Sequence, residues 1–357
     1  MIKIVYIGWL NSQNIGDELM LEVFKELCDK YLKLNETQIS FANIGVTIDE
    51  IEDYDTIILG GGSILLENTI DVLYKAVNKN KKVIIWGSGY DWINKDFIPS
   101  LIDSNIPCYI LPFKDEIKLI EIIKKSKFIG VRGPLTKALF KNSSNNINKI
   151  NVIGDIAFLL KPSALSSNCP ILSLDYSEKV IAINWGTTFN KLYGNNELNV
   201  ENSLVSICKK LIENKHKIYI YTMWPTDIDS CINLYKKIND CNNVILDFNK
   251  YNGGQIISIL EKCIFSINFK LHASILSAVA STPFVCLGYR FKCFDFIKSI
   301  DCDELIVATD SSNLEEDINT TINLIESKHD YICSKINNNI SIYANSFEET
   351  FKNIILN

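Results

Sequence analysis

The hydrophobic pattern of the chain alternates between two periods. Short runs rich in Ile and Val predict strands buried on both faces, and longer stretches with apolar residues every three to four positions predict amphipathic helices. In the first half, strands are predicted at 2–8, 56–60, 82–87, 128–131 and 151–153, and helices at 16–32, 63–78, 114–125 and 134–141. Strands that alternate with helices in this way indicate a parallel sheet with helical crossovers.

The second half repeats this pattern after a Pro- and Ser-containing stretch at 161–170 that is typical of a linker. Strands are predicted at 180–184, 217–221, 244–246, 263–269 and 283–287, and helices at 198–214, 227–239, 254–261 and 272–281. We therefore predict an α/β fold with two Rossmann-like domains, residues 1–165 and 171–312, that face a central cleft. The segment 313–357 is predicted to form C-terminal helices that can pack back on the first domain.

Composition narrows the class of protein. The chain has 357 residues, more than one ordinary core accommodates, and its 47% hydrophobic and 22% charged residues are typical of a folded globular protein. The net charge of −6, without a basic block, argues against a nucleic-acid partner. No apolar run reaches the roughly 18 to 20 residues of a membrane span, so no integral membrane segment is expected.

The eleven cysteines include no Cys-x-x-Cys pair, so their spacing predicts neither a zinc site nor a disulfide framework. Free thiols fit a reducing compartment, and we expect a cytoplasmic protein, with peripheral association with a membrane left open.

Three glycine-bearing loops follow predicted strands of the first half. They contain the sequences Asn14-Ile15-Gly16-Asp17-Glu18, Gly60-Gly61-Gly62-Ser63 and Trp86-Gly87-Ser88-Gly89-Tyr90-Asp91. Neither a dinucleotide fingerprint nor a P-loop is present. Each loop alone fits a tight turn or a helix cap that stabilises its helix by about 1 kcal/mol. Together, at consecutive strand ends, the loops would also form a rim of backbone amides facing a ligand.

Cationic and titratable side chains occupy further strand ends. His272 lies between the apolar strand 263–269 and the helix 272–281, and Lys270 precedes it by two positions. Ligands of open α/β sheets bind at such edges, although a lone histidine also fits a packed core position. Arg132 follows another strand, where it fits either a surface ion pair or a fork onto a carboxylate or phosphate. Tyr289 and Lys292 follow the strand 283–287.

Taken in order, these segments resemble the polysaccharide pyruvyl transferase family over roughly residues 4–295. The family usually has Arg where this chain has Lys270. A lysine ammonium is a point charge and cannot bind a carboxylate or phosphate through two parallel hydrogen bonds as a guanidinium does, so the geometry and identity of the donor stay open. The matching segments are Asn14 to Glu18, Asp55 to Ser63, Val131 to Thr136, Gly154 to Phe158, Lys270 to Ala273, Pro283, and Tyr289 to Lys292.

The resemblance implies a glycosyltransferase-B-type fold and transfer of pyruvate from phosphoenolpyruvate onto two sugar hydroxyls of a surface glycan as a ketal. Phosphoenolpyruvate and a sugar or glycan, which can be lipid-linked, are the implied partners, and no cofactor or metal is implied. The first domain would hold the acceptor and the second the donor.

The same resemblance assigns roles to individual residues. His272 is the implied general acid, and a helix N-terminus disfavours its imidazolium until the anionic donor binds. The implied donor-binding residues are Arg132, Lys270, Leu271, Tyr289 and Lys292. The implied acceptor-binding residues are Asn14, Gly16, Asp17, Gly61, Gly62 and Ser63, with the aromatic residues Trp86, Tyr90 and Trp92 as further candidates.

Two other functions remain open at this point. A nucleotide-sugar-dependent glycosyltransferase can share the same fold, but it needs a ribose partner in the second domain, where Asp295 is the acidic candidate. A catalytically silent glycan-binding homologue is expected if the change to Lys270 is disabling.

Overall fold

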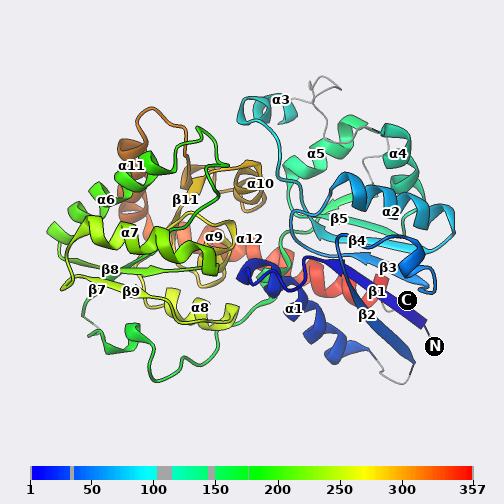
Figure 1. Ribbon diagram of the computed structural model, residues 1–357, viewed down its shortest axis with the longest axis horizontal. Helices are drawn as coiled ribbons and strands as arrows, with labels where there is room; N and C mark the ends of the chain where they lie inside the picture. The colour runs from blue at the N-terminus through cyan, green and yellow to red at the C-terminus, as the bar shows by residue number, and fades with distance from the viewer. Residues whose placement is uncertain (1, 33–35, 103–114, 144–148, 176, 356–357) are drawn as a thin grey trace.

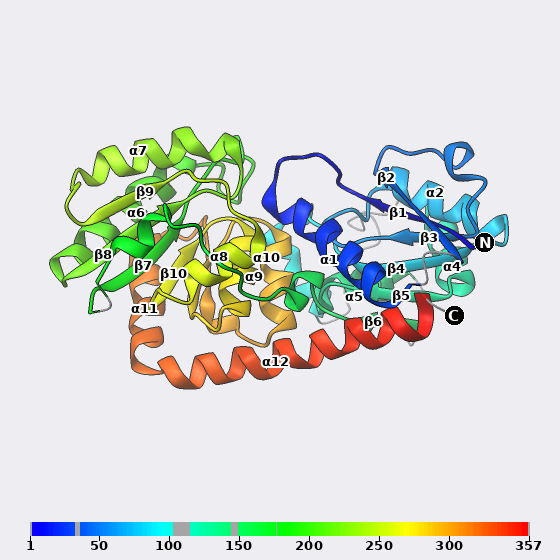
Figure 2. The same ribbon diagram turned by 90° about the horizontal axis from the view of Figure 1, so that it is seen from below.

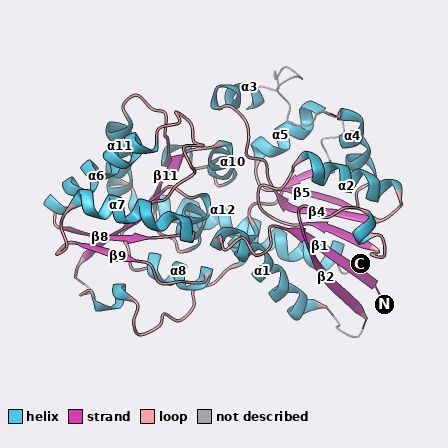
Figure 3. Cartoon of the chain, in the orientation of Figure 1, coloured by secondary structure: helices cyan, strands magenta, loops and turns pink. Residues whose placement is uncertain are grey.

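The computed structural model describes residues 2–32, 36–102, 115–143, 149–175 and 177–355. In this part of the chain, strands and helices form two α/β halves, each built around a six-stranded parallel sheet (Figure 1). Helices cover the sheets, and the loops at one edge of each sheet face the other half (Figure 3).

The first sheet has the strand order β2-β1-β3-β4-β5-β6. Its central strands are buried on both faces, so they read as continuous Ile and Val runs. The strands are β1 (Ile2–Gly8), β2 (Thr37–Asn43), β3 (Thr56–Leu59), β4 (Lys82–Ser88), β5 (Phe128–Val131) and β6 (Ile150–Val152). The helices are α1 (Ile15–Tyr31), α2 (Glu67–Asn78), α3 (Ile98–Ile102), α4 (Glu116–Lys125) and α5 (Pro134–Ser143).

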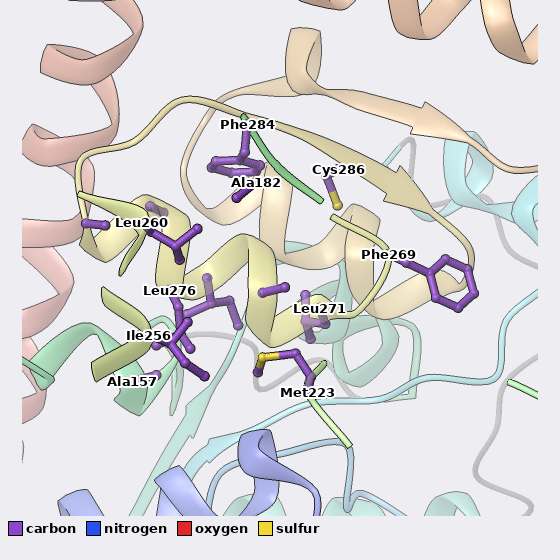
Figure 4. Close-up of a cluster of buried hydrophobic side chains, with 14 of the residues drawn as sticks. Ala157, Ala182, Met223, Ile256, Leu260, Phe269, Leu271, Leu276, Phe284 and Cys286 are labelled. Carbon is purple, nitrogen blue, oxygen red and sulfur yellow. The ribbon is translucent and has the colours of Figure 1, made fainter. Parts of the chain in front are cut away.

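The second sheet has the order β12-β11-β10-β7-β8-β9. Its strands are β7 (Lys179–Asn184), β8 (His216–Tyr221), β9 (Val244–Asp247), β10 (Phe265–Asn268), β11 (Phe284–Gly288) and β12 (Ile306–Ala308). Its helices are α6 (Glu197–Glu213), α7 (Ile228–Ile238), α8 (Gly253–Leu260), α9 (Leu271–Val279), α10 (Phe291–Ser299) and α11 (Leu314–Ser327). Apolar side chains of α9 pack in a core with residues of β10, β11 and α8, which fixes the first turn of α9 (Figure 4).

The last helix, α12 (His329–Thr350), runs along both halves (Figure 2). It continues into a short π-helix, Phe351–Ile355. The rings of Phe347 and Phe351 pack against Trp86 of β4, with ring centroids 5.4 and 5.8 Å apart. The C-terminal segment therefore completes the core of the first half. No helix of the described residues is long and apolar enough to span a membrane.

Four strands and α-helices of the described residues lie where the sequence pattern predicted none. These are β2, α3, α10 and β12. The predicted helix at 63–78 begins only at Glu67, because the chain is extended at its N-cap, Leu66. The predicted start of the next helix, at 114, lies outside the described residues.

Candidate active site

The candidate site lies between the halves, at the carboxyl ends of strands from both sheets. A cavity of about 360 Å³ is lined by residues that follow β1, β3, β4 and β5 in the first half and β8, β10 and β11 in the second. This volume is within the range of small-molecule sites. Ten predicted site residues line the cavity: Asn14, Asp17, Gly62, Ser63, Arg132, Lys270, Leu271, His272, Tyr289 and Lys292.

His272 lies in the first turn of α9, as the strand-to-helix pattern predicted. Its Nε2 atom is 3.8 Å from Oδ2 of Asp155, a fully buried residue that follows β6. Neither atom has a hydrogen-bond partner among the described residues. The other oxygen of Asp155 accepts a hydrogen bond from the Ala157 amide at 3.1 Å. The imidazole therefore has a carboxylate beside it.

The surroundings of His272 favour its neutral imidazole. Burial, and then the positive charges of Arg132 and Lys292, lower its pKa to about 3. Gly16 explains how the ring fits, because a Cβ atom at that position would lie 2.0 Å from the His272 Nδ1 atom. The backbone of α1 in the first half thus touches the imidazole of the second half.

Arg132 is a buried cation with neutral partners. Its side chain is 1% exposed, which makes the surface-ion-pair interpretation wrong. Its Nη2 atom donates to Ser63 Oγ at 3.1 Å and more weakly to the Tyr90 carbonyl at 3.5 Å. Its Nε atom has no hydrogen-bond partner among the described residues. Such a guanidinium can bind an anion that enters the cavity.

Lys270 is held by a buried carboxylate that sequence reasoning missed. Its Nζ atom lies 3.0 Å from Asp227 Oδ1 and donates to the Thr187 carbonyl at 2.6 Å. The ammonium also lies 5.5 Å from the centre of the Trp224 ring. Asp227 follows β8 by a few residues, so its place after a predicted strand was the available signal.

A further group of ion pairs crosses the cleft. Asp91, from the loop after β4, lies 3.2 Å from Arg290 Nη1 and 3.3 Å from Lys292 Nζ, both after β11. The Arg290 guanidinium lies 4.9 Å from the centre of the Trp92 ring. Arg290 was noticed only as part of a motif and Asp91 only as part of a glycine-bearing loop, because a sequence does not show which ends of different sheets meet.

A model of the polysaccharide pyruvyl transferase family matches residues 14–290, most of the chain. The chain belongs to the polysaccharide pyruvyl transferase family. This match confirms the resemblance drawn from the ordered motifs, and it includes Asn14 at one end and Arg290 at the other. No curated protein matches the sequence.

Similar solved structures establish the fold of this family member. Staphylococcus aureus MnaA, in a structure with UDP, has a TM-score of 0.65 at 10% identity and covers 100% of this chain and 97% of its own. A putative UDP-N-acetylglucosamine 2-epimerase from Listeria monocytogenes has a TM-score of 0.62 at 12% identity, and the match covers 98% of this chain and 96% of the epimerase. The lipopolysaccharide outer core galactosyltransferase WaaB has a TM-score of 0.54 at 12% identity, with 99% of each chain covered. Two Rossmann-like domains in a glycosyltransferase-B-type arrangement are thereby confirmed.

Several residues that the sequence predicted to bind the acceptor have structural roles in this fold. In this pyruvyl transferase family member, Asn14 caps α1 by accepting a hydrogen bond from the Gly16 amide at 3.0 Å. Burial raises the pKa of Asp17, which accepts a hydrogen bond from Ser12 Oγ at 3.1 Å. Gly61 lies behind the cavity lining, where an added Cβ would approach Met20 of α1 to 2.5 Å.

The three aromatic residues that the sequence offered as acceptor contacts differ in their position relative to the cavity. Trp86 is fully buried against α12, so its prediction as an acceptor residue is wrong. The hydrophobic run of β4 places this ring in the core. Tyr90 is not among the residues that line the cavity, whereas Trp92 lines it and is 57% exposed.

Asp295, the acidic candidate for a ribose contact, caps a helix of the other half instead. Its Oδ1 atom accepts hydrogen bonds from the amides of Leu135 and Thr136 at 2.9 and 3.1 Å. Its Oδ2 atom accepts one from Thr136 Oγ1 at 2.6 Å. Because Asp295 is fully buried, it is closed to a ligand in this structure.

Among the described residues, no group of three or more His, Cys, Asp or Glu side chains is placed to hold a metal ion.

Proposed function

We propose that this family member transfers pyruvate from phosphoenolpyruvate onto two hydroxyls of a sugar, forming a ketal. The observation that carries the proposal is the charge of the cavity around His272. Four cationic side chains, Arg132, Lys270, Arg290 and Lys292, line it against the carboxylates of Asp17 and Asp91. Asp227 and Asp155 lie behind this lining, beside Lys270 and His272, so the excess of positive charge belongs to the lining itself. A lining of this kind suits a small donor that carries both a carboxylate and a phosphate.

The four cationic side chains proposed to bind the donor differ in the protein groups that they already contact. Among the described residues, Arg132 donates hydrogen bonds only to neutral groups, its Nε atom has no partner, and its charge interacts with the buried carboxylates of Asp155 and Asp295 without a direct contact. We therefore propose it as a site for an anionic oxygen of the donor. Lys292 and Arg290 share Asp91, and a bound donor competes with that carboxylate for their positive charges. Lys270 directs two of its three N–H groups to Asp227 and Thr187 and keeps the third for the donor.

His272 is the proposed general acid. The donor's negative charge raises the pKa of the imidazole, and Asp155 beside Nε2 stabilises the imidazolium. The proton passes to the methylene carbon of the donor, which becomes the methyl group, and positive charge develops on the central carbon. General acid catalysis of this kind contributes about 10²- to 10⁴-fold.

The remaining bonds balance without another reactant. One sugar hydroxyl attacks the central carbon, a second hydroxyl attacks the same carbon, and the carbon–oxygen bond to phosphate breaks. The two hydroxyls release two protons; one replaces the proton given to the methyl group and the other leaves with hydrogen phosphate. His272 is thereby protonated again, and it returns to its neutral form when the anionic products leave and the imidazolium releases that proton to solvent.

A nucleotide-sugar-dependent glycosyltransferase is the second candidate, because similar structures are described with UDP or with UDP-GlcNAc. The buried position of Asp295 disfavours it, since that carboxylate is already used by α5.

Parallel reactions with phosphoenolpyruvate and with UDP-sugars, each with a set of bacterial oligosaccharides, separate the candidates. We expect release of phosphate with phosphoenolpyruvate and no release of UDP. Calorimetry with the donor alone supplies a second readout, because pyruvyl transfer requires donor binding. Release of UDP, or no donor binding at millimolar concentration, contradicts the proposal.

A further inference from the structure

The tryptophans of this protein are concentrated at one cavity. The sequence contains five, of which Trp86 and Trp185 are buried in the two halves with 0% and 1% exposure. The other three, Trp9, Trp92 and Trp224, all line the cavity that contains His272. Every tryptophan outside the cores therefore lies at the candidate active site.

These three indoles come from both halves. Trp9 directly follows β1, Trp92 follows β4, and Trp224 follows β8. Trp9 is 41% exposed and Trp92 is 57% exposed, although large aromatic side chains are usually mostly buried. We call Trp9, Trp92 and Trp224 the tryptophan rim.

Specific contacts hold two rings of the tryptophan rim in place. The Arg290 guanidinium lies over Trp92 at 4.9 Å, and the Lys270 ammonium lies 5.5 Å from the Trp224 ring centre. Trp224 Nε1 also donates to the Ser12 carbonyl across the cleft at 3.2 Å. Cations on the ring faces and a hydrogen bond at an edge fix these indoles without burying them.

The donor does not explain the tryptophan rim. Phosphoenolpyruvate is a small anion whose charged groups match Arg132 and the lysines, and it offers little apolar surface. Exposed aromatic surface beside polar groups marks a site for a ligand with an apolar face and a polar edge. A pyranose ring has both: its C–H face stacks on an indole, and its hydroxyls reach groups such as Ser12 and Asp17 in the cavity.

We propose that the tryptophan rim binds an oligosaccharide, stacking sugar rings that lie outside the one that receives pyruvate. This inference rests on the proposed function for the role of the site, and it assigns to Trp9, Trp92 and Trp224 the binding of the sugars next to the one that receives pyruvate. The rim on two domains also predicts that acceptor binding holds the halves together.

Intrinsic tryptophan fluorescence and calorimetry test the proposal without donor. The probes are N-acetylchitooligosaccharides and β-linked galacto-oligosaccharides of one to four sugars. We expect affinity to rise with chain length in at least one series, with a change in tryptophan emission. Trp9→Ala is expected to weaken tetrasaccharide binding by about three- to tenfold, the range for one lost aromatic stacking contact.

Tyr331→Ala is the matched control, since Tyr331 is 63% exposed on α12 and is absent from the cavity lining. Its oligosaccharide affinity should equal that of the wild type. Trp9→Ala should bind phosphoenolpyruvate with close to wild-type affinity, because among the described residues the proposed donor cations Lys270 and Arg290 lie over Trp224 and Trp92 rather than over Trp9.

The outcomes separate this inference from the proposed function. Oligosaccharide binding that depends on Trp9, without phosphoenolpyruvate binding, supports the tryptophan rim and contradicts pyruvyl transfer. Absence of binding by every probe, affinity independent of Trp9, or UDP binding that is lost in Trp9→Ala overturns the inference.

Discussion

The ionisation of His272 is the residue-scale feature on which the mechanism depends. Burial and the positive charges of Arg132 and Lys292 hold the pKa of its imidazole at about 3, so the ring is neutral at pH 7. An anionic donor adjacent to it favours the charged form and raises that pKa. Binding therefore takes up a proton whenever the pH lies between the free and the bound pKa. Affinity is greatest at low pH and is lost as the pH rises through the bound pKa.

We predict that phosphoenolpyruvate binding takes up close to one proton near neutral pH, with affinity falling by up to about tenfold per pH unit over that range. Calorimetry in buffers of different ionisation enthalpy measures the uptake. His272→Gln is the control, because it removes the titrating group and leaves the donor's own phosphate titration. Equal proton uptake in both proteins contradicts the role of His272.

Lys270 and Asp227 form the second residue-scale prediction. Removing the lysine alone leaves a buried carboxylate unpaired, at a cost of about 3–5 kcal/mol in the free energy of unfolding. The double variant K270M/D227N avoids this cost, and we expect it to remain folded. It should lose donor affinity by about 10- to 100-fold, since a charged hydrogen bond contributes about 1.5–3 kcal/mol.

K270R is the matched control for this pair, because it keeps the charge and restores the residue usual in the family. Donor titration of both variants should show near-normal affinity in K270R only. If the double variant binds the donor like the wild type, Lys270 is not a donor residue.

Sequence reasoning located the functional side chains that adjoin strand ends and missed their partners. His272, Lys270 and Arg132 follow predicted strands, so the edge of the sheet placed them near a ligand. Asp227 was missed, and Asp155 was noticed only inside a motif, because their importance comes from contacts across the fold. How the loops of the fold come together in three dimensions decides these contacts, and no local sequence pattern encodes that arrangement.

At the scale of elements, α1 and α9 meet at the active site. Gly16 in the first turn of α1 leaves room for the imidazole of α9. Any other amino acid at this position would place a Cβ atom against that ring. The cap by Asn14 and the first turn of α9 thus hold the His272 imidazole of one domain against the backbone of the other.

We predict that Gly16→Ala lowers turnover by about 100-fold, since the new Cβ displaces the His272 ring by the order of 1 Å. Steady-state phosphate release measures the loss. Thermal unfolding should change little, because the new Cβ meets side-chain atoms of His272 rather than backbone, and this side chain borders the cavity. Gly45→Ala is the control, because its Cβ meets nothing within 4 Å. Normal turnover in Gly16→Ala would show that the ring position is not critical.

Three of the elements that the pattern did not predict share a weak hydrophobic signal. β2 pairs on one side only, with β1, and alternates between exposed and half-buried residues. β12 has three residues. The Lys, Cys and Asp residues within α10 obscured its period, although Asp295 is there to cap α5. Tertiary contacts rather than local hydrophobicity specify these elements.

At the scale of the whole molecule, α12 ties the two halves together. It begins beside the second sheet and ends in the core of the first, where Phe347 meets Trp86 (Figure 2). Cross-cleft contacts such as the Asp91 ion pairs and the Asp295 cap add to this connection. The Pro- and Ser-containing composition at 161–170 predicted a boundary between the two domains, and the sequence also predicted C-terminal helices within 313–357 that can pack back on the first domain.

We predict that Phe347→Ala lowers the free energy of unfolding by about 3–5 kcal/mol, because it leaves a cavity beside Trp86. Chemical denaturation followed by tryptophan fluorescence measures the change. Ile342→Ala is the matched control on the same helix, since Ile342 is 65% exposed, and it should shift stability by less than about 0.5 kcal/mol. Equal stability of the two variants would show that α12 does not support the first half.

The central claim is that His272 delivers a proton to the donor during pyruvyl transfer. Reaction in deuterium oxide followed by mass spectrometry of the glycan product measures this directly. We predict that the wild type forms a ketal whose methyl group carries one deuterium, with one phosphate released per ketal, and that His272→Gln forms the product at least about 100-fold more slowly. Ketal formation at the wild-type rate by His272→Gln, or release of nucleotide in place of phosphate, would contradict the account.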